Sequence, residues 1–402
     1  MVGAGFAGLV SALVCGRKGM KVTLIDKRDL DQTHVSQGKH AHMLTKKGLN
    51  ILCELFPEIE EEYLSVRFTK LHFTHDVKWV GPYQAYPRFH SDFGNIYTFY
   101  RPDLDRILVE MLAKLTNVEI LSGVEVLGFH RKGTAMSGVA TAGGDIFSDN
   151  VIVTTGRFGN SEKTLEALNI KKYEKESIPS ILKYRSFELE SSYFEEKDYQ
   201  AIMATTFGEI NPNGTVMIPI TKNRFMVTQV GKDLSTEVMA FSDCLHTPEI
   251  SEVLRKSKIV TPPITYKLEG SRRYSFKKVQ NWPEGLLMLG DAAVFMNPIF
   301  AQGLTLALIQ CEALNHFLDT ESSSFDFQVS VDELIQEPWF LGTLEDRRLN
   351  AKSWQRPFYT VAEKCVAQVL KKATQDKATY LKLVETLNML SSPVSFFNLR
   401  VF

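Results

Sequence analysis

Apolar residues recur along the chain with two different periods, which separate the expected helices from the expected strands. After a glycine-rich opening, apolar residues three and four apart predict a helix, and the run "KVTLID" behind it predicts a short strand that ends at Asp26. The middle of the chain alternates or runs apolar as strands do, with a hairpin expected around Thr221, Lys222 and Asn223. Helical spacing returns from about residue 331. The pattern therefore predicts an α/β fold with a β-rich middle.

The amino terminus carries a glycine motif, because Gly3, Gly5 and Gly8 have the G-x-G-x-x-G spacing of a dinucleotide-binding turn. The first glycine allows a tight turn, the second lets a pyrophosphate approach the backbone, and the third lets the helix pack closely on the sheet. Asp26 can accept the hydroxyls of an adenosine ribose. A glycine-rich turn without a ligand is the alternative, but glycines, helix, strand and terminal acid in this order favour a nucleotide site. The same stretch adds four expected binding residues: Ala4, Phe6, Ala7 and Lys27.

A dinucleotide-binding fold places a strand of about five residues before the first glycine. The sequence offers Met1 and Val2 there. We therefore expect that a strand of roughly four to six residues, rich in Val or Ile, precedes Gly3 in the natural protein.

Length and composition change this picture little. The chain has 402 residues, which suits two intertwined domains, and 44% apolar with 23% charged residues describe an ordinary soluble globular protein. A net charge of −1 gives no electrostatic reason to expect nucleic acid. The five cysteines are odd in number and show no CxxC spacing, so we expect reduced thiols in a cytoplasmic protein. We expect no transmembrane segment and no signal peptide.

A second motif, "GDAAVFMNPIFAQG" at residues 290–303, decides between nicotinamide and flavin. Asp291 follows an apolar strand, so its carboxylate can accept a hydrogen bond from a sugar-alcohol hydroxyl. The amides around Gly303, Leu304 and Thr305 open a helix and can donate to an electron-rich ring edge. A ribityl chain and an isoalloxazine ring need both features, whereas an NAD pyrophosphate does not. The motif therefore favours FAD.

With these pieces the chain resembles the FAD-dependent monooxygenases of the para-hydroxybenzoate hydroxylase fold, whose relatives include flavin-dependent halogenases and geranylgeranyl reductases. The matching pieces are "GAGFAG" with Asp26, "YRPDLDRILVEML" with Arg101, and "GDAAVFMNPIFAQG". The resemblance implies an α/β fold with an FAD-binding Rossmann-like domain, an interleaved β-sheet substrate domain and carboxyl-terminal helices. The implied boundaries are residues 1–70, 95–160 and 271–330 for the FAD-binding domain, 71–94 and 161–270 for the substrate domain, and 331–402 for a helical cap.

The resemblance also implies roles for individual residues. Arg101 would lie against the cofactor phosphates, although a surface arginine near a helix start is the alternative, and the Val126 backbone would meet adenine. Lys39 or His40 would meet the diphosphate. His40 and His42 alternate, but no nearby Cys or carboxylate pair completes a metal site, so we expect no metal. Asp291 would bind ribityl or phosphate-side groups, and Pro298 and Gly303 would border the flavin.

Two departures from the family pattern concern the flavin and its reduction. Ala301 stands where many members have a second glycine, and its methyl group would crowd the flavin edge or alter its mobility. Thr155 and Gly156 stand where the aromatic hydroxylases carry an Asp-Gly pair that serves NAD(P)H and FAD together. The electron source is therefore open between NAD(P)H and a partner flavin reductase. The tryptophan-halogenase signature W-x-W-x-I-P is absent, which makes a halogenase a less favoured interpretation without excluding it.

The motif around Pro298 also supplies the expected wall of a substrate pocket, in which Phe295, Met296 and Phe300 join Phe225. Further wall candidates, each with core packing as the alternative, are Phe93, Phe99 and Tyr274. The resemblance implies that reduced flavin reacts with O2 to give a hydroperoxide at C4a, and the sequence shows no nucleophile and base set, so no catalytic residue is assigned. The expected function is hydroxylation or epoxidation of a hydrophobic or aromatic small molecule. A halogenase, an isoprenoid double-bond reductase and a non-catalytic prenyl-binding protein are the alternatives.

Overall fold

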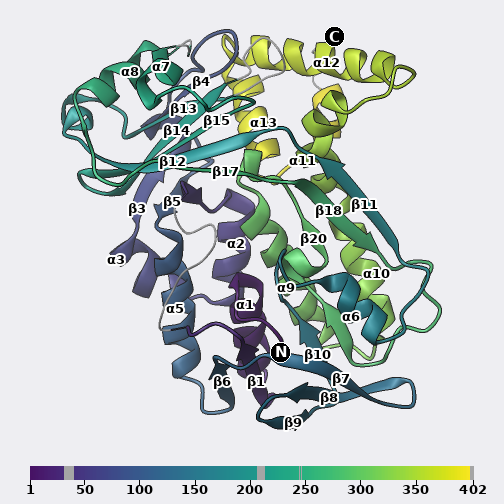
Figure 1. Ribbon diagram of the computed structural model, residues 1–402. Coiled ribbons are helices and arrows are strands. Elements are labelled where there is room, and N and C mark those ends of the chain that lie inside the picture. Colours follow the sequence, from purple (N-terminus) through teal and green to yellow (C-terminus); the bar gives the residue numbers. More distant parts are fainter. Residues whose placement is uncertain (31–39, 206–212, 244, 246, 399–402) are drawn as a thin grey trace.

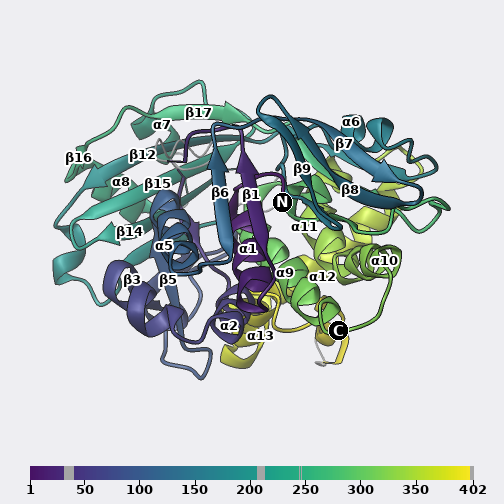
Figure 2. The same cartoon turned by 90° about the horizontal axis from the view of Figure 1, so that it is seen from below.

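The computed structural model describes residues 1–30, 40–205, 213–243, 245 and 247–398. A parallel sheet forms one end of the molecule, and the opening residues 1–3 lie in its centre (Figures 1 and 2). Val2 forms parallel bridges to Ile25 on one side and to Val153 on the other. Residues before Gly3 thus take the position of the expected first strand, and the expectation of a longer strand stays a prediction. The strands run in the order β6 (Val118–Ser122), β1 (Val22–Asp26), residues 1–3, β10 (Val151–Val153) and β19 (Leu286–Met288).

Helix α1 is the centre of the layer that covers this sheet. All its residues except Arg17 are buried, because α5 and α9 pack on it while its own strand lies beneath. Helix α2 packs on α9 in turn, and α10 packs on α9 and β19. A helix enclosed on every side needs no polar face, which explains its apolar sequence. The bounds are α1 (Phe6–Arg17), α2 (Lys46–Leu55), α5 (Arg101–Ala113), α9 (Gly303–Phe317) and α10 (Ser324–Leu334).

A larger, mainly antiparallel sheet lies at the other end of the molecule (Figure 1). The expected hairpin around Thr221 is confirmed, since β14 and β15 pair on either side of Lys222 and Asn223. Helices α7 (Val238–Asp243) and α8 (Pro248–Arg255) pack on one face of the sheet and bury an apolar core there. Its strands are β16 (Lys258–Ile259), β12 (Lys183–Glu190), β15 (Arg224–Gly231), β14 (Gly214–Thr221), β13 (Ala201–Ala204) and β4 (Val77–Val80), with β17 (Ile264–Lys267) also paired to β12.

Three small sheets and several short helices join these layers. One sheet extends the nucleotide-binding end, another lies beside α2, and the third leads to the motif at residues 290–303. The sheets are β7 (Val126–Lys132), β8 (Ala135–Thr141) and β9 (Gly144–Phe147); β2 (His42–Met43), β5 (Asn95–Phe99) and β3 (Thr69–His72); and β11 (Glu174–Pro179), β18 (Gly270–Ser275) and β20 (Val294–Phe295). The short helices are α3 (Ser65–Arg67), α4 (Phe73–Asp76), α6 (Ser161–Ala167), η1 (Glu60–Leu64), η2 (Tyr193–Glu196), η3 (Gly290–Ala292), η4 (Pro298–Phe300) and η5 (Pro393–Asn398).

The helices expected after residue 331 are present as α11 (Gln336–Leu349), α12 (Arg356–Ala373) and α13 (Lys377–Leu387). The end of α13 is docked on the start of the motif helix and of α2 by two hydrogen bonds. Gln302 Nε2 donates to the Leu387 carbonyl at 3.1 Å, and the Lys46 amide donates to Asn388 Oδ1 at 2.9 Å. Helix α12 is held less firmly, with Val369 and Ala373 as its buried residues.

Two runs in which apolar residues recur as they do in a single strand are divided in the structure. "LHFTHDVKWV" forms β3 and β4 with the short helix α4 between them. "PITYKLEGSRRYSF" forms β17 and β18, which belong to different sheets. Gly270 makes that crossing possible, because its φ is +130° and a Cβ there would lie 2.0 Å from the Ile178 carbonyl oxygen. Periodicity alone does not show where a chain changes sheets.

The glycine turn gives a stability prediction. A Cβ at Gly8 would lie 1.9 Å from the Gly3 carbonyl oxygen and 2.8 Å from Thr154 Oγ1, so Gly8→Ala must push α1 off the sheet. We expect a loss of about 1–3 kcal/mol or more in the free energy of unfolding, as for other overpacked cores. Urea unfolding measures it, with Gly143→Ala as control, since that exposed glycine has Thr141 Oγ1 at 3.7 Å as its neighbour. Equal stability of the two variants would contradict the close packing.

Candidate functional site

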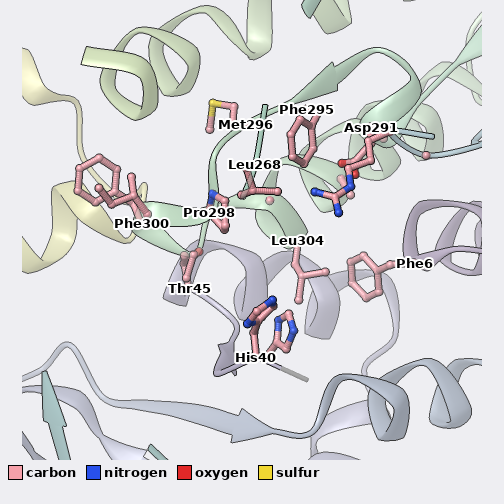
Figure 3. Close-up of a pocket in the computed structure, with 18 of the residues that line it drawn as sticks. Phe6, His40, Thr45, Leu268, Asp291, Phe295, Met296, Pro298, Phe300 and Leu304 are labelled. Atoms are coloured by element: carbon pink, nitrogen blue, oxygen red, sulfur yellow. The ribbon is translucent and has the colours of Figure 1, made fainter. Parts of the chain in front are cut away.

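One continuous cavity of about 1410 Å³ lies between the parallel sheet, the antiparallel sheet and the carboxyl-terminal helices. The glycine turn and Asp26 line one end, and Pro298 and Phe300 line another part. Pockets for single small molecules usually measure about 300–1,000 Å³. The cavity is therefore large enough for a cofactor together with a second ligand. Figure 3 shows part of it, with side chains from the motif at 290–303 facing those of Phe6 and His40.

The glycine turn presents bare backbone to this cavity. Gly3 has a φ of +105°, and a Cβ there would lie 2.6 Å from the Thr154 carbonyl oxygen, so the first glycine is required by the turn. Gly5 lines the cavity, and a Cβ there would meet nothing within 4 Å. Gly5 is also the N-cap of α1 and gives no side-chain cap, which leaves the first N–H groups of the helix for an anion. Phe6 and Ala7 line the cavity beside it.

Asp26 ends β1 at the cavity, as the motif predicts, but it already has protein partners. Its carboxylate accepts from the Ala4 amide at 2.7 Å and from Arg28, through the backbone at 2.8 Å and the guanidinium at 2.9 and 3.0 Å. Burial acts to raise the pKa of Asp26, but the hydrogen bonds from Arg28 and Ala4 outweigh it and lower that pKa. The carboxylate thus stays charged beside the expected ribose. Sequence reasoning missed Arg28, which also lines the cavity, although its place two residues after the acid was visible. The neighbouring Lys27 lines the rim, its side chain 72% exposed.

Asp291 lies on η3 directly after β19 and lines the cavity. Burial raises the pKa of Asp291 to about 6, against the opposing charges of Arg157, Arg101 and Arg272. The Nε atoms of Arg157 and Arg272 are buried without a hydrogen-bond partner in the described structure. The Asp291 carboxylate is thus buried near guanidinium groups that still have free N–H donors. Such a site suits a polar ligand, for example a ribityl or phosphate group.

The ring end of the site is built from the turn between η4 and α9. Pro298 and Leu304 point toward the cavity in Figure 3. Gly303 begins α9 without a side-chain cap in the preceding residue, and a Cβ there would meet nothing within 4 Å. Thr305 does not line the cavity, because its hydroxyl is buried against Thr45 Oγ1 at 2.7 Å. Free helix amides beside an open glycine are the donors expected at a flavin edge.

Ala301 lies in this turn with φ 54° and ψ 28°, which is left-handed backbone that favours glycine. The departure noted in the sequence is therefore a residue held in a conformation that costs about 1–2 kcal/mol for a side chain with a Cβ. Its neighbour Phe300 and Ala301 itself both line the cavity.

His40 belongs to a polar group under the antiparallel sheet. Its Nδ1 lies 2.6 Å from Ser186 Oγ, which lies 2.7 Å from Thr228 Oγ1, and the Tyr266 ring packs edge-on at 3.9 Å between centroids. Burial, with the charges of His42 and Arg157, lowers the pKa of His40 to about 3. His40 lines the cavity, and its expected contact with a diphosphate stays a prediction, which a neutral imidazole could make through one hydrogen bond. Lys39, the other candidate, lies outside the described residues.

Most of the other cofactor candidates line the cavity. Arg101 begins α5, pairs with Asp105 at 2.9 Å and lies 5.0 Å from the centre of the Phe6 ring. Val126, the candidate for the adenine contact, begins β7 and lines the cavity. Thr155 and Gly156 follow β10, and among the described residues the buried Thr155 hydroxyl has no hydrogen-bond partner and a Cβ at Gly156 would have no neighbour within 4 Å. Ala4 and Gly8 support the turn without lining the cavity themselves.

The expected pocket wall is correct in part. Phe295, Met296 and Phe300 line the cavity, whereas Phe225 does not. The reason is the alternation of β15: Thr228 and Val230 face the cavity, and the odd-numbered Phe225 faces the core under α7 and α8. Three further wall candidates pack in other cores and do not line the cavity: Phe93, Phe99 and Tyr274.

Three features face the same cavity: a glycine turn at a helix terminus, an acid at the end of the next strand, and a second helix terminus. Together they define a protein that binds a dinucleotide cofactor through two half-sites. Residues 1–318 match the family model described as "FAD binding domain", so the chain belongs to the FAD-binding-domain family. The fold and the cofactor predicted from the sequence, FAD, are thereby confirmed.

Known proteins similar to this chain share little sequence with it. Protein Rv3254 of Mycobacterium tuberculosis is 23% identical over 351 residues, which are 81% of this chain and 73% of that protein. The structure of PqsL of P. aeruginosa in complex with 2-aminobenzoylacetate matches with a TM-score of 0.65 and 17% identity, over 90% of this chain and 98% of that one. The flavin-dependent brominase Bmp2 matches with a TM-score of 0.67 and 16% identity, over 99% and 96%. These structures show a shared fold.

Two further properties concern the described residues alone. No helix among them combines the length and the apolar character that a membrane crossing needs. No group of three or more His, Cys, Asp or Glu in that part of the chain is arranged to hold a metal ion.

Asp291 gives the prediction of this site. Ribityl hydroxyls donate to a charged carboxylate, so FAD affinity should fall as pH drops through the pKa of about 6, by about tenfold between pH 7 and pH 5. Asp291→Asn should bind FAD roughly tenfold or more weakly at pH 7, because charge-assisted hydrogen bonds are lost, and its affinity should change little with pH. Titration of the apoprotein with FAD measures both.

Asp149→Asn is the matched control, since Asp149 is exposed and does not line the cavity. It should keep the affinity and the pH profile of the unmodified protein. If Asp291→Asn binds FAD as tightly at pH 7 as this control does, Asp291 does not hold the cofactor.

Proposed function

We propose that the protein is an FAD-dependent monooxygenase that hydroxylates or epoxidises a hydrophobic or aromatic small molecule. The observation that carries the proposal is the continuity of the cavity, which joins the FAD half-sites to a chamber walled by Phe295, Met296 and Phe300. The relatives of the same fold support it, because one similar structure is described as a probable FAD-dependent monooxygenase from Pseudomonas aeruginosa and another as 2-methyl-3-hydroxypyridine-5-carboxylic acid oxygenase.

The residues present fit FAD along its whole length. Open space at Gly5 and Gly303 would admit the pyrophosphate and the ring edge, and Asp26 and Asp291 would accept hydrogen bonds from the two sugar-derived groups. Arg101 would lie against the phosphates. Bound FAD, once reduced, supplies the activation of O2 for transfer of one oxygen atom. The protein's own contribution is to hold the reactants together and to keep the chamber dry.

Two neutral polar groups of the chamber have unused hydrogen-bonding capacity that a substrate could take up. His40 Nε2 and the Tyr266 hydroxyl are buried without hydrogen-bond partners in the described structure, and both residues line the cavity. Since the pKa of His40 is about 3, its ring remains neutral at physiological pH and can donate or accept one hydrogen bond. We assign this pair to orientation of a hydroxyl or carbonyl group on the substrate.

Electrons would come from a partner flavin reductase in this proposal, with NAD(P)H as the ultimate donor. Thr155 and Gly156 stand at the cavity where relatives that bind NAD(P)H carry an acid, and this supports an external source. We also propose a cytoplasmic location, on the basis of five cysteines that show no disulfide-like spacing.

Phe300 tests the oxygenation proposal. Phe300→Ala opens the chamber wall, so activated oxygen should be lost to water and the ratio of hydrogen peroxide to product should rise while oxygen uptake persists. The measurement is peroxide against product at saturating FAD with chemically supplied electrons. A cooperative melt and retained FAD are needed controls, because Phe300 is half-buried and its ring contributes to local packing. A folded, FAD-loaded variant that stays fully coupled would show that Phe300 is not part of the chamber.

Phe158→Ala is a matched control, because this exposed phenylalanine lies at the cavity rim and is 73% exposed. It should leave coupling unchanged. The reaction should also proceed without halide. If the unmodified protein takes up no oxygen with reduced flavin, the monooxygenase proposal is wrong, and a double-bond reductase becomes the better candidate.

The electron source gives a separate prediction. NADPH mixed with the FAD-loaded protein in a stopped-flow instrument should bleach the flavin slowly and without saturation, whereas a flavin reductase with NADPH should support turnover. Fast, saturable bleaching by NADPH alone would show that the chain binds the nicotinamide directly. Restoring the acid in Thr155→Asp is the informative variant, because it should increase any direct rate.

A further inference from the structure

The cavity continues past the chamber into a branch between the three carboxyl-terminal helices. This branch begins where Phe300 points away from Pro298 toward the carboxyl-terminal part of the chain (Figure 3). Helix α11 closes one side, since the missing Cβ of Gly342 lets the Met296 side chain approach within 2.9 Å of that position. The apolar residues lining the branch are Phe340, Leu341, Leu344, Phe358, Val361, Ala362, Cys365, Val366, Val369, Leu370, Leu383, Leu387, Pro393 and Phe396.

Helix α12 turns one whole face toward this branch. Phe358, Val361, Ala362, Cys365 and Val369 recur at helical spacing and all line it. From Phe358 to Val369 the face runs for about 16 Å, at 1.5 Å per residue. A single aromatic ring fills a small part of that length. Phe358 and Val361 are 61% and 62% exposed, which is costly for a helix face unless a ligand covers it.

The charged residues at the branch pair with one another. Arg348 lies 2.8 Å from Glu345 and 3.7 Å from Glu363. Arg348 therefore neutralises one of the two glutamates, and a charge of −1 remains at this edge of the branch. Most other described residues that line the branch are apolar, which favours an apolar ligand there.

We propose that this branch binds a flexible aliphatic tail of the substrate, so that the substrate is an amphiphile whose reactive head lies at the flavin and whose tail lies along α12. The inference deepens the proposed function and depends on it for the position of the head. The observations behind the tail site are separate from those behind the proposed function. The branch, its length and its apolar walls do not depend on which reaction is catalysed. The continuity of the branch with the chamber favours a tail over an unrelated ligand.

The test is equilibrium dialysis of 4-alkylphenols, with tails from methyl to nonyl, against the oxidised, FAD-loaded protein. Each buried methylene contributes about 0.8 kcal/mol, so affinity should tighten about three- to fourfold per added carbon while the tail lies in the branch. Ala362→Trp should abolish this gain for the longer tails and leave 4-methylphenol unaffected. Gln368→Trp is the matched control, because Gln368 is exposed on α12 and does not line the cavity, and it should keep the full gain.

Trp354→Ala checks that the probe enters the branch. This tryptophan is 75% exposed beside α12 but does not line the cavity, so its removal should not change the gain. Three results would each overturn the tail site. The first is an affinity that does not depend on tail length, and the second is absence of binding by every phenol. The third is loss of the gain in Trp354→Ala but not in Ala362→Trp. None of these results involves turnover, so they are distinguishable from failure of the monooxygenase proposal, which shows as absence of oxygen uptake.

Discussion

The close packing of backbone around Thr154 is the constraint on which the nucleotide-binding end depends. Thr154 Oγ1 donates to the Gly3 carbonyl at 2.7 Å and its amide donates to the Val2 carbonyl at 2.8 Å, which fixes the opening residues against β10. Gly3 and Gly8 have no side chains, and α1 can therefore begin directly on this surface. The free amides of that helix end are aimed into the cavity as a consequence. Loss of this contact would move the anion site, the ribose acid on β1 and the helices packed on α1 together.

Two helix termini, from residues some 300 positions apart, converge on the same cavity by the same means. Both α1 and α9 start without a side-chain cap. Gly5 directly precedes α1 and Gly303 begins α9, and the missing Cβ of each glycine leaves open space. Side chains then set the electrostatics: Asp26 is kept charged by Arg28, whereas burial raises the pKa of Asp291 to about 6. The two acids expected at the sugar-derived groups thus differ, because the pKa of one is lowered and the pKa of the other is raised. Burial lowers the pKa of His40, which lines the same cavity, to about 3.

The sequence predicted the parts of this site that depend on local chemistry. The glycine spacing, the acid ending a strand and the Asp291 motif each need a residue type at a fixed offset, and the structure brings them to one cavity. The predictions that failed required knowing which way a side chain points, or which residues distant in sequence lie in contact. Phe225 was assigned to the wall although strand alternation turns it away. Tyr266 and the α12 face were missed because only the packing of separate sheets and helices brings them to the cavity. Gly270, where the chain changes sheets, likewise gave no periodic signal.

The docking of α13 has a consequence for how the molecule is made. The bonds from Gln302 to the Leu387 carbonyl and from the Lys46 amide to Asn388 join residues that are 85 and 342 positions apart. During synthesis, Lys46 therefore cannot form its bond to Asn388 until the chain has been made as far as Asn388, 342 positions further on. This side of the cavity can close only after that. Contacts between residues so distant in sequence are slow to form, and apolar surface stays uncovered meanwhile. Chaperone demand and the timing of cofactor loading should thus be set by the last helices to emerge, although the nucleotide motif itself emerges first.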